Sequence, residues 1–200
     1  MDSATARERG RAARQAVDPA LQRSRANELA SVSAAALFPF VGQGDDLTSK
    51  VLAGYVATDG ELDPSATLSH AARLGATIAF PVVGQRSTMR FVAVDAATRW
   101  GTNRFGIAEP ESGAEIGVAD LDAVLVPCTA VDRSGHRVGR GAGYYDRAFT
   151  GTPGRAFGPI LVAVAHAEQV MTAIAVTPHD VVMDAVATPE GFHWTGRSRR

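Results

Sequence analysis

Apolar residues in the first part of the chain recur at the spacing of amphipathic helices. They follow this spacing over residues 20–37, where Asp18 and Pro19 form a good N-cap and first helical position. A second helix is predicted over residues 63–74, and Gly75 is placed to end it. A third, shorter helix is predicted to begin at Tyr144.

The other apolar residues fall into short continuous runs that are typical of buried strands. These runs occupy residues 51–57, 76–83, 124–126 and 159–165. Residues 88–94 alternate enough for an edge or hairpin strand. Strands that alternate with helices in this way indicate an α/β fold whose sheet is largely parallel.

We expect one domain over residues 1–200, with helices on both faces of the sheet in a Rossmann-like, three-layer arrangement. The 200 residues are close to the usual size of a single domain. Ligands of such folds bind at the carboxyl ends of the strands. Residues 99–106 read as a loop. We expect residues 1–16 and 195–200 to be flexible, because both segments are rich in arginine and lie at chain ends.

Composition narrows the possible environments and partners. The formal net charge of −1 gives no general attraction to nucleic acid or membrane, so anion binding requires a local cluster of basic residues. Cys128 is the only cysteine, which favours a reducing cytoplasm, and no apolar run approaches a membrane span. The only lysine, Lys50, does not follow a glycine-rich loop, which excludes a P-loop nucleoside triphosphatase. We expect a cytoplasmic monomer.

A glycine-rich segment after the predicted strand at 124–126 contains such a basic cluster. Arg137 and Arg140 alternate with three glycines, so backbone amides and guanidinium groups can both approach a polyanion. Asp146 follows closely and is a hard oxygen ligand suited to a phosphate-bound Mg²⁺. A glycine-rich surface turn with solvated arginines is the alternative interpretation of such a segment taken alone.

The longer pattern around this loop resembles the signature of the 5-formyltetrahydrofolate cyclo-ligase family. The matching residues are Pro127, Asp132, Gly135, Arg137, Gly139, Gly141, Gly143, Tyr144, Tyr145, Asp146 and Arg147. The resemblance implies ATP binding by the loop and by the N-terminus, at Arg7, Arg137, Val138, Gly139, Arg140, Gly141, Ala142, Gly143, Tyr144 and Tyr145. It also implies catalytic roles for Arg140 and Tyr144.

Two further segments resemble the same family and suggest the folate and metal sites. YVATDGELD at residues 55–63 resembles a strand and loop whose glutamate binds the pterin, which assigns Glu61 to the folate with Tyr55 and Val56 as the wall. The implied folate site also includes residues 140–144 of the glycine loop, which are Arg140, Gly141, Ala142, Gly143 and Tyr144. The segment TPHDVVMDAVAT near the C-terminus implies that Asp180 holds Mg²⁺ together with Asp146, whereas Asp184 is structural.

The N-terminus departs from the family pattern. Family members carry a lysine and an arginine four positions apart near the start of the first helix, and their counterparts are Ser3 and Arg7. The lysine is therefore missing, and Arg7 or Arg11 is the expected substitute.

The implied reaction is the ATP- and Mg²⁺-dependent cyclisation of 5-formyltetrahydrofolate to 5,10-methenyltetrahydrofolate, with release of ADP and phosphate. Transfer of the γ-phosphoryl group to the formyl oxygen makes that oxygen a good leaving group, so the protein supplies mainly positioning and charge. A non-catalytic paralogue that binds nucleotide or folate is the alternative, because the N-terminal lysine is missing. A dinucleotide-dependent oxidoreductase is disfavoured, because the glycine loop comes late in the chain and carries arginines.

Overall fold

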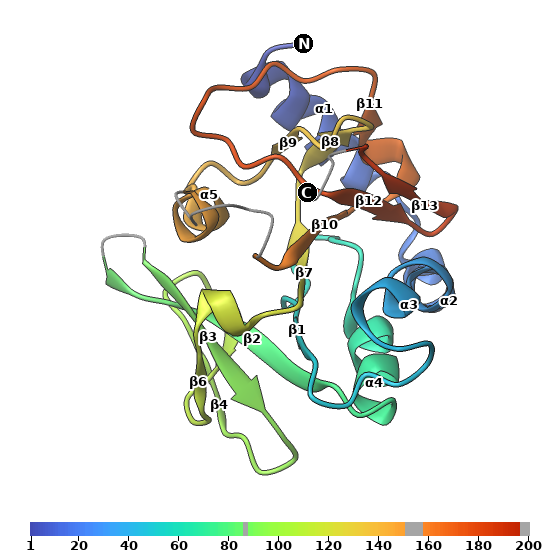
Figure 1. Ribbon diagram of the computed structural model, residues 1–200. Helices are drawn as coiled ribbons and strands as arrows, with labels where there is room; N and C mark the ends of the chain where they lie inside the picture. Colours follow the sequence, from blue (N-terminus) through green and yellow to red (C-terminus); the bar gives the residue numbers. More distant parts are fainter. Residues whose placement is uncertain (86–87, 151–157, 197–200) are drawn as a thin grey trace.

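The computed structural model describes residues 1–85, 88–150 and 158–196 of the chain (Figure 1). An 8-stranded sheet forms its centre, in the order β13-β12-β10-β7-β1-β2-β3-β6. The bounds of these strands are β1 Val51–Ala53, β2 Thr77–Val83, β3 Met89–Val94, β6 Glu115–Ile116, β7 Ala123–Pro127, β10 Ile160–Val164, β12 Ala185–Thr188 and β13 Gly191–Trp194. The central strands β12, β10, β7, β1 and β2 are parallel, and β13, β3 and β6 add antiparallel edges. The prediction of a largely parallel sheet in an α/β fold is confirmed.

Alternate residues of each central strand pack into different cores, as the two-residue period of a strand requires. In β7, Leu125 belongs to the core on one face and Val124 to the core on the other. Val162 and Leu161 of β10 divide in the same way, and β10 is in register with β7 from Ile160 to Val164. Both faces of the sheet are therefore buried, which explains the uninterrupted apolar runs in the sequence.

Helices cover the two faces unequally. One face carries α2 Gln22–Ala36, α3 Phe38–Val41 and α4 Ser65–Arg73, which pack on each other and on the sheet. The helix α5 Tyr144–Phe149 lies on the other face, next to β3 (Figure 1). The 3₁₀ turns are η1 Pro19–Leu21, η3 Val118–Asp120 and η4 Ala167–Gln169. None of the helices within the described ranges is long and apolar enough to cross a membrane.

Two smaller sheets are formed by segments that connect the strands of the main sheet. One consists of β8 Ala130–Asp132, β9 Arg137–Val138 and β11 Val170–Met171, and the other of β4 Trp100–Thr102 and β5 Ala108–Pro110. The segment 99–106, predicted to be a loop, thus contains the short strand β4. A strand of three residues surrounded by polar neighbours has too little apolar periodicity to be recognised in sequence.

The expectation that residues 1–16 are flexible is wrong. Residues 3–15 form the helix α1 Ser3–Gln15, whose first amides are capped by the carboxylate of Asp2. The helix packs against β8, β9 and η4. Gly10 permits this contact, because a Cβ atom there would lie 2.2 Å from the carbonyl oxygen of Thr129. At the other end, Thr195 and Gly196 are described, whereas residues 197–200 of the expected flexible tail lie outside the described residues.

The strand predicted over residues 51–57 is shorter than expected. Pairing continues as far as Gly54, whose amide donates to the carbonyl of Ala79 at 3.0 Å. The next side chain, Tyr55, is buried and donates its hydroxyl to the carbonyl of Leu62 in the following loop. The chain therefore leaves the sheet after β1, and residues 55–61 become available to line a cavity.

Candidate active site

A cavity of about 460 Å³ opens at the carboxyl ends of β1 and β7. Its walls come from seven segments: the start of α1, the loop after β1, the loop after β7, the hairpin β2–β3, the segment 103–108, the glycine loop 137–146 and the loop before β12. All fifteen site residues predicted from sequence line it: Arg7, Tyr55, Val56, Glu61, Arg137, Val138, Gly139, Arg140, Gly141, Ala142, Gly143, Tyr144, Tyr145, Asp146 and Asp180. This position agrees with the expectation for a parallel sheet, whose ligands bind where the strands end.

The glycine loop connects β9 to α5 and depends on backbone conformations that favour glycine. Gly141 and Gly143 have φ values of 102° and 66°, in the left-handed region. Gly143 is also the N-cap of α5, so the loop passes directly into the helix as predicted. Arg7 ties the loop to α1, because its Nε donates to the carbonyl oxygen of Gly139 at 2.9 Å. The N-terminal helix is thus part of the site.

Arg137 is held at the base of the loop by Asp146. Its side chain is 5 % exposed, and its Nη2 lies 2.9 Å from Oδ1 of Asp146. The guanidinium also lies over the ring of Tyr145, 5.7 Å from the centroid. Its Nε is buried and has no hydrogen-bond partner among the described residues. The Arg137 side chain lines the cavity, where its positive charge can attract an anionic ligand.

Arg140, in contrast, reaches across the cavity to the loop that carries Glu61. Its Nη2 lies 3.1 Å from Oε1 of Glu61, and the same nitrogen donates to the carbonyl of Thr58 at 3.2 Å. A further bond from this nitrogen goes to the hydroxyl of Thr58. The Arg140 side chain remains 40 % exposed, so it can exchange these partners for a ligand.

Glu61 is nearly buried and sits between two arginines. Its side chain is 8 % exposed, and Oε1 lies 3.5 Å from Nη1 of Arg14 and 3.1 Å from Nη2 of Arg140. Burial raises the pKa of the Glu61 carboxyl above its usual value, while Arg140, the amide of Thr58 and Arg14 act in the opposite direction. The arginines therefore favour the ionised carboxylate in a site that would otherwise favour the protonated acid.

The aromatic residues of the prediction form parts of the cavity wall. Tyr55 is 5 % exposed, and burial raises the pKa of its hydroxyl well above the ordinary value, so it is a neutral donor. Tyr144 lies nearer the mouth, where its hydroxyl accepts a hydrogen bond from Nη2 of Arg104 at 2.5 Å. Its ring meets that of Phe105 edge-on, with the centroids 6.2 Å apart.

The sequence interpretation missed the apolar wall opposite the glycine loop. This wall comes from the hairpin β2–β3 and the segment before β5, and consists of Phe80, Pro81, Val83, Met89, Phe105, Ile107 and Ala108. Glu109 fixes its position, because Oε2 accepts from the amide of Val83 at 3.1 Å and from the side-chain amide of Asn103 at 3.2 Å. The one sequence feature that could have indicated this wall is Phe105, an aromatic residue within a polar segment. In the structure its side chain is 52 % exposed.

Asp146 and Asp180 suit a metal that also binds a phosphate ligand. Both carboxylates line the cavity beside the glycine loop. Backbone amides orient them: Val181 donates to Asp146 at 3.2 Å and Thr177 to Asp180 at 2.6 Å. Within the described ranges no group of three or more His, Cys, Asp or Glu side chains gathers as a metal cage. Two carboxylates are what Mg²⁺ commonly takes from a protein when nucleotide oxygens and water complete its shell.

The remaining residues named in the sequence analysis lie partly in the cavity wall and partly outside it. Ser3, the counterpart of the missing lysine, lines the cavity together with Arg7, whereas Arg11 is exposed and is not among the lining residues. Cys128 also lines the cavity, but burial raises the pKa of its thiol to about 12, which rules out a thiolate nucleophile. Asp184 is structural as expected, because its carboxylate accepts from the amide of Leu161 at 2.8 Å.

Comparison with known proteins agrees with this geometry. The model of the 5-formyltetrahydrofolate cyclo-ligase family matches residues 6–189. A 5-formyltetrahydrofolate cyclo-ligase from Mycolicibacterium smegmatis is 32 % identical over 158 residues, which are 74 % of this chain and 77 % of the relative. The Escherichia coli K12 protein of the same name is 29 % identical over 142 residues, or 69 % of this chain and 77 % of the relative.

Solved structures show that the fold is shared as well. The NMR structure of Aquifex aeolicus 5,10-methenyltetrahydrofolate synthetase superimposes with a TM-score of 0.80 at 24 % identity, covering 99 % of this chain and 95 % of that chain. A 5,10-methenyltetrahydrofolate synthetase from Mycoplasma pneumoniae gives 0.73 at 17 % identity, covering 94 % and 99 %. With a family match that spans nearly the whole chain and a matching fold, the protein belongs to the 5-formyltetrahydrofolate cyclo-ligase family.

Proposed function

We propose that the protein converts 5-formyltetrahydrofolate to 5,10-methenyltetrahydrofolate with consumption of ATP. One observation carries the proposal: a single cavity holds the buried acceptor Glu61 on one side and the arginine- and glycine-rich loop on the other. A pterin presents paired N–H donors that suit a carboxylate, and a triphosphate suits backbone amides with guanidinium groups. Membership of the family supports the same assignment.

The folate enters with its pterin on Glu61 and its aromatic portion along the apolar wall. Tyr55 and Val56 line the cavity close to Glu61, and Tyr144 and Phe105 stand nearer the mouth. Because Arg140 contacts Oε1 of Glu61, the pterin takes over this contact in the proposed complex. Arg140 is then released within reach of the formyl group and the nucleotide.

ATP binds on the glycine loop with its phosphates toward Arg137 and Arg140. The charge of Arg137 at the cavity wall supports this placement, as do Gly141 and Gly143, whose backbone can approach phosphate closely. Arg7 both supports the loop through Gly139 and adds a positive charge at the cavity wall. In this arrangement Arg7 replaces the lysine that the N-terminus lacks.

The formyl oxygen then attacks the γ-phosphorus of ATP. The new oxygen–phosphorus bond forms while the bond to the β–γ bridging oxygen breaks, so ADP leaves. N10 next attacks the formyl carbon, and the carbon–oxygen bond breaks to release phosphate, which takes up the N10 proton as it departs. No step demands a general base of the protein, which contributes positioning and positive charge.

Asp146 and Asp180 would hold Mg²⁺ beside the phosphates. Bound there, the cation neutralises phosphate charge and aligns the γ-phosphoryl group. The two carboxylates are kept in place by the amides of Val181 and Thr177. Asp146 also forms an ion pair with Arg137, so the same carboxylate would position both the cation and the guanidinium group.

The test is the appearance of the methenyl product's absorbance when purified protein is mixed with 5-formyltetrahydrofolate, ATP and Mg²⁺. Product must depend on all three, and equimolar ADP must accumulate. Normal binding of ATP and folate with no product would instead establish a non-catalytic paralogue. Size-exclusion chromatography with light scattering tests the accompanying proposal that the protein acts as a monomer.

A further inference from the structure

Glu61 follows a tight turn whose two central residues are left-handed. Asp59 and Gly60 both have positive φ values, 54° and 74°. The amide of Glu61 closes the turn on the carbonyl of Thr58 at 3.1 Å. Aspartate tolerates the left-handed region and glycine favours it, so the Asp-Gly pair itself sets this tight turn and places Glu61 directly after it.

Arg14 of α1 holds this turn from the side away from the cavity. It is 1 % exposed, yet it does not line the cavity. Its Nη2 binds the carboxylate of Asp59, and its Nη1 lies 3.5 Å from Oε1 of Glu61. Its Nε and Nη1 have no hydrogen-bond partner among the described residues. Burial of an arginine with donors unused is expensive, which suggests a role beyond packing.

His166 contacts the same turn through the backbone of Gly60. Its Nε2 lies 3.1 Å from the carbonyl oxygen of Gly60, and its Nδ1 lies 3.2 Å from Nη1 of Arg25. A carbonyl can only accept and a guanidinium can only donate, so Nε2 carries the proton and Nδ1 does not. The ring is therefore neutral, which agrees with the lowered pKa that burial and Arg25 impose.

We propose that Arg14 is a positioning residue of the reaction: it acts through the turn 58–61 as the permanent counter-cation of Glu61, so that Arg140 can leave when the folate binds. This inference rests on the proposed function. Arg140 is exposed and belongs to a glycine loop, whereas Arg14 is enclosed and fixed to a helix. Without Arg14, departure of Arg140 would leave a buried carboxylate without compensation, and the carboxyl would take up a proton.

The other groups near Glu61 cannot serve as its counter-charge. The neighbouring hydroxyls of Tyr55 and Tyr145 and the thiol of Cys128 all have pKa values raised by burial, so they are neutral. Asp59 is a carboxylate paired with Arg14 and cannot supply a positive charge. Once Arg140 departs, Arg14 is the remaining cation in ion-pair contact with Glu61 within the part of the chain that the structure describes.

The experiment measures binding of 5-formyltetrahydrofolate without ATP, by calorimetry from about pH 5 to 8, for the parent and four variants. Arg14→Met should weaken folate binding about tenfold at neutral pH and shift the acid midpoint of binding upward by about one unit, because a tenfold change corresponds to one pKa unit. Arg14→Lys should restore the midpoint but not the full affinity, since an ammonium lacks the guanidinium fork. ATP affinity should stay within about twofold in both variants.

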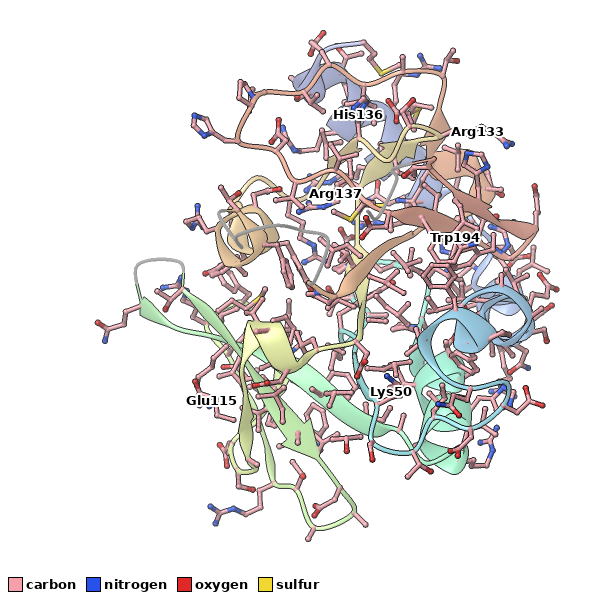
Figure 2. All side chains as sticks on the ribbon, viewed as in Figure 1. Lys50, Glu115, Arg133, His136, Arg137 and Trp194 are labelled. Atoms are coloured by element: carbon pink, nitrogen blue, oxygen red, sulfur yellow. The ribbon has the colours of Figure 1, made fainter. Side chains whose placement is uncertain are left out.

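Asp59→Asn separates charge from packing. It removes the ion pair with Arg14 but leaves Arg14 beside Glu61, so the acid midpoint should not rise. Lys50→Met is the matched control, because Lys50 forms a 3.1 Å ion pair with Asp122 at the opposite end of the sheet from Arg137 (Figure 2). It should leave both ligands and the midpoint unchanged.

Two results would overturn the inference. One is a parent-like folate affinity and midpoint in Arg14→Met. The other is equal weakening of folate and ATP in Arg14→Lys, which decides the matter even where Arg14→Met does not fold. Failure of the proposed function has a different signature, because the parent protein itself would then bind no formyl folate or form no product.

Discussion

Arg140 and Glu61, 79 positions apart in the chain, form an ion pair across the cavity, with Nη2 3.1 Å from Oε1. The pair joins the loop assigned to phosphate with the loop assigned to folate. Under the proposed function, the pterin and Arg140 compete for the Glu61 carboxylate, so we expect folate binding and the placement of Arg140 to be coupled through this contact.

Arg140→Ala should lower kcat about 10²–10³-fold and leave the KM for ATP within a few-fold, because the arginine stabilises charge that develops during phosphoryl transfer. Arg140→Lys should recover only part of the rate. Steady-state turnover measures both. Arg133→Ala is the control, since Arg133 is exposed and lies at the periphery of the molecule (Figure 2). Parent-like turnover of Arg140→Ala would place phosphoryl stabilisation elsewhere.

Glu61→Gln should raise the KM for 5-formyltetrahydrofolate about tenfold to a hundredfold. The glutamine amide group would face the N–H donors of the pterin with an N–H donor of its own. This mismatch costs ~1–3 kcal/mol. The KM for ATP should not increase. Glu115→Gln at the sheet edge, where Glu115 is exposed, should change neither constant. Equal loss for both ligands would instead mean that Glu61 supports the fold.

Arg7→Ala should weaken ATP binding about tenfold, because it removes both a positive charge and the hydrogen bond to Gly139, a bond worth ~1.5–3 kcal/mol when one partner is charged. Equilibrium binding of ATP provides the measurement. Arg9→Ala, two positions along the same helix and exposed, is a closely matched control. If the two variants behave alike, Arg7 does not replace the missing lysine.

Asp146→Asn should raise the Mg²⁺ concentration needed for half-maximal turnover about tenfold, because a neutral amide is a weaker ligand for a hard cation. The variant also removes the partner of the buried Arg137, so its thermal midpoint should fall. A magnesium titration of turnover separates the two effects. Asp45→Asn at an exposed loop position should alter neither. An unchanged magnesium requirement would remove Asp146 from the metal site.

His166→Gln should reduce the amount by which the free energy of unfolding falls on mild acidification. The folded protein lowers the pKa of His166, so the unfolded chain binds a proton first as the pH falls through about 6.5, and stability declines until the lower folded pKa is reached. Glutamine can make the same two contacts without titrating. Urea unfolding at about pH 7.5 and 5.5 should show a smaller difference than in the parent. His193→Gln, at an exposed position of β13, should retain the parent's difference.

Local sequence determined much of the fold, because its main elements carry strong local signals. Residues 63–74 enclose α4 and residues 76–83 enclose β2, as predicted. Apolar periodicity and glycine stops suffice for such elements, since each one buries its own face. The failures lie where order is imposed from outside: α1 is polar and reads as a frayed end, yet it is fixed by packing against β8, β9 and η4.

The candidate site also has parts that the sequence predicted and parts that only the structure revealed. The sequence predicted that Arg137, Arg140, Asp146 and Glu61 belong to one site, and all four line one cavity because parallel strands bring their loops to one edge. Only the tertiary structure decided that Arg14 lies behind Glu61 and that the hairpin β2–β3 supplies the apolar wall. These relations join residues far apart in the chain through burial and side-chain direction, neither of which has a local pattern that a sequence can display.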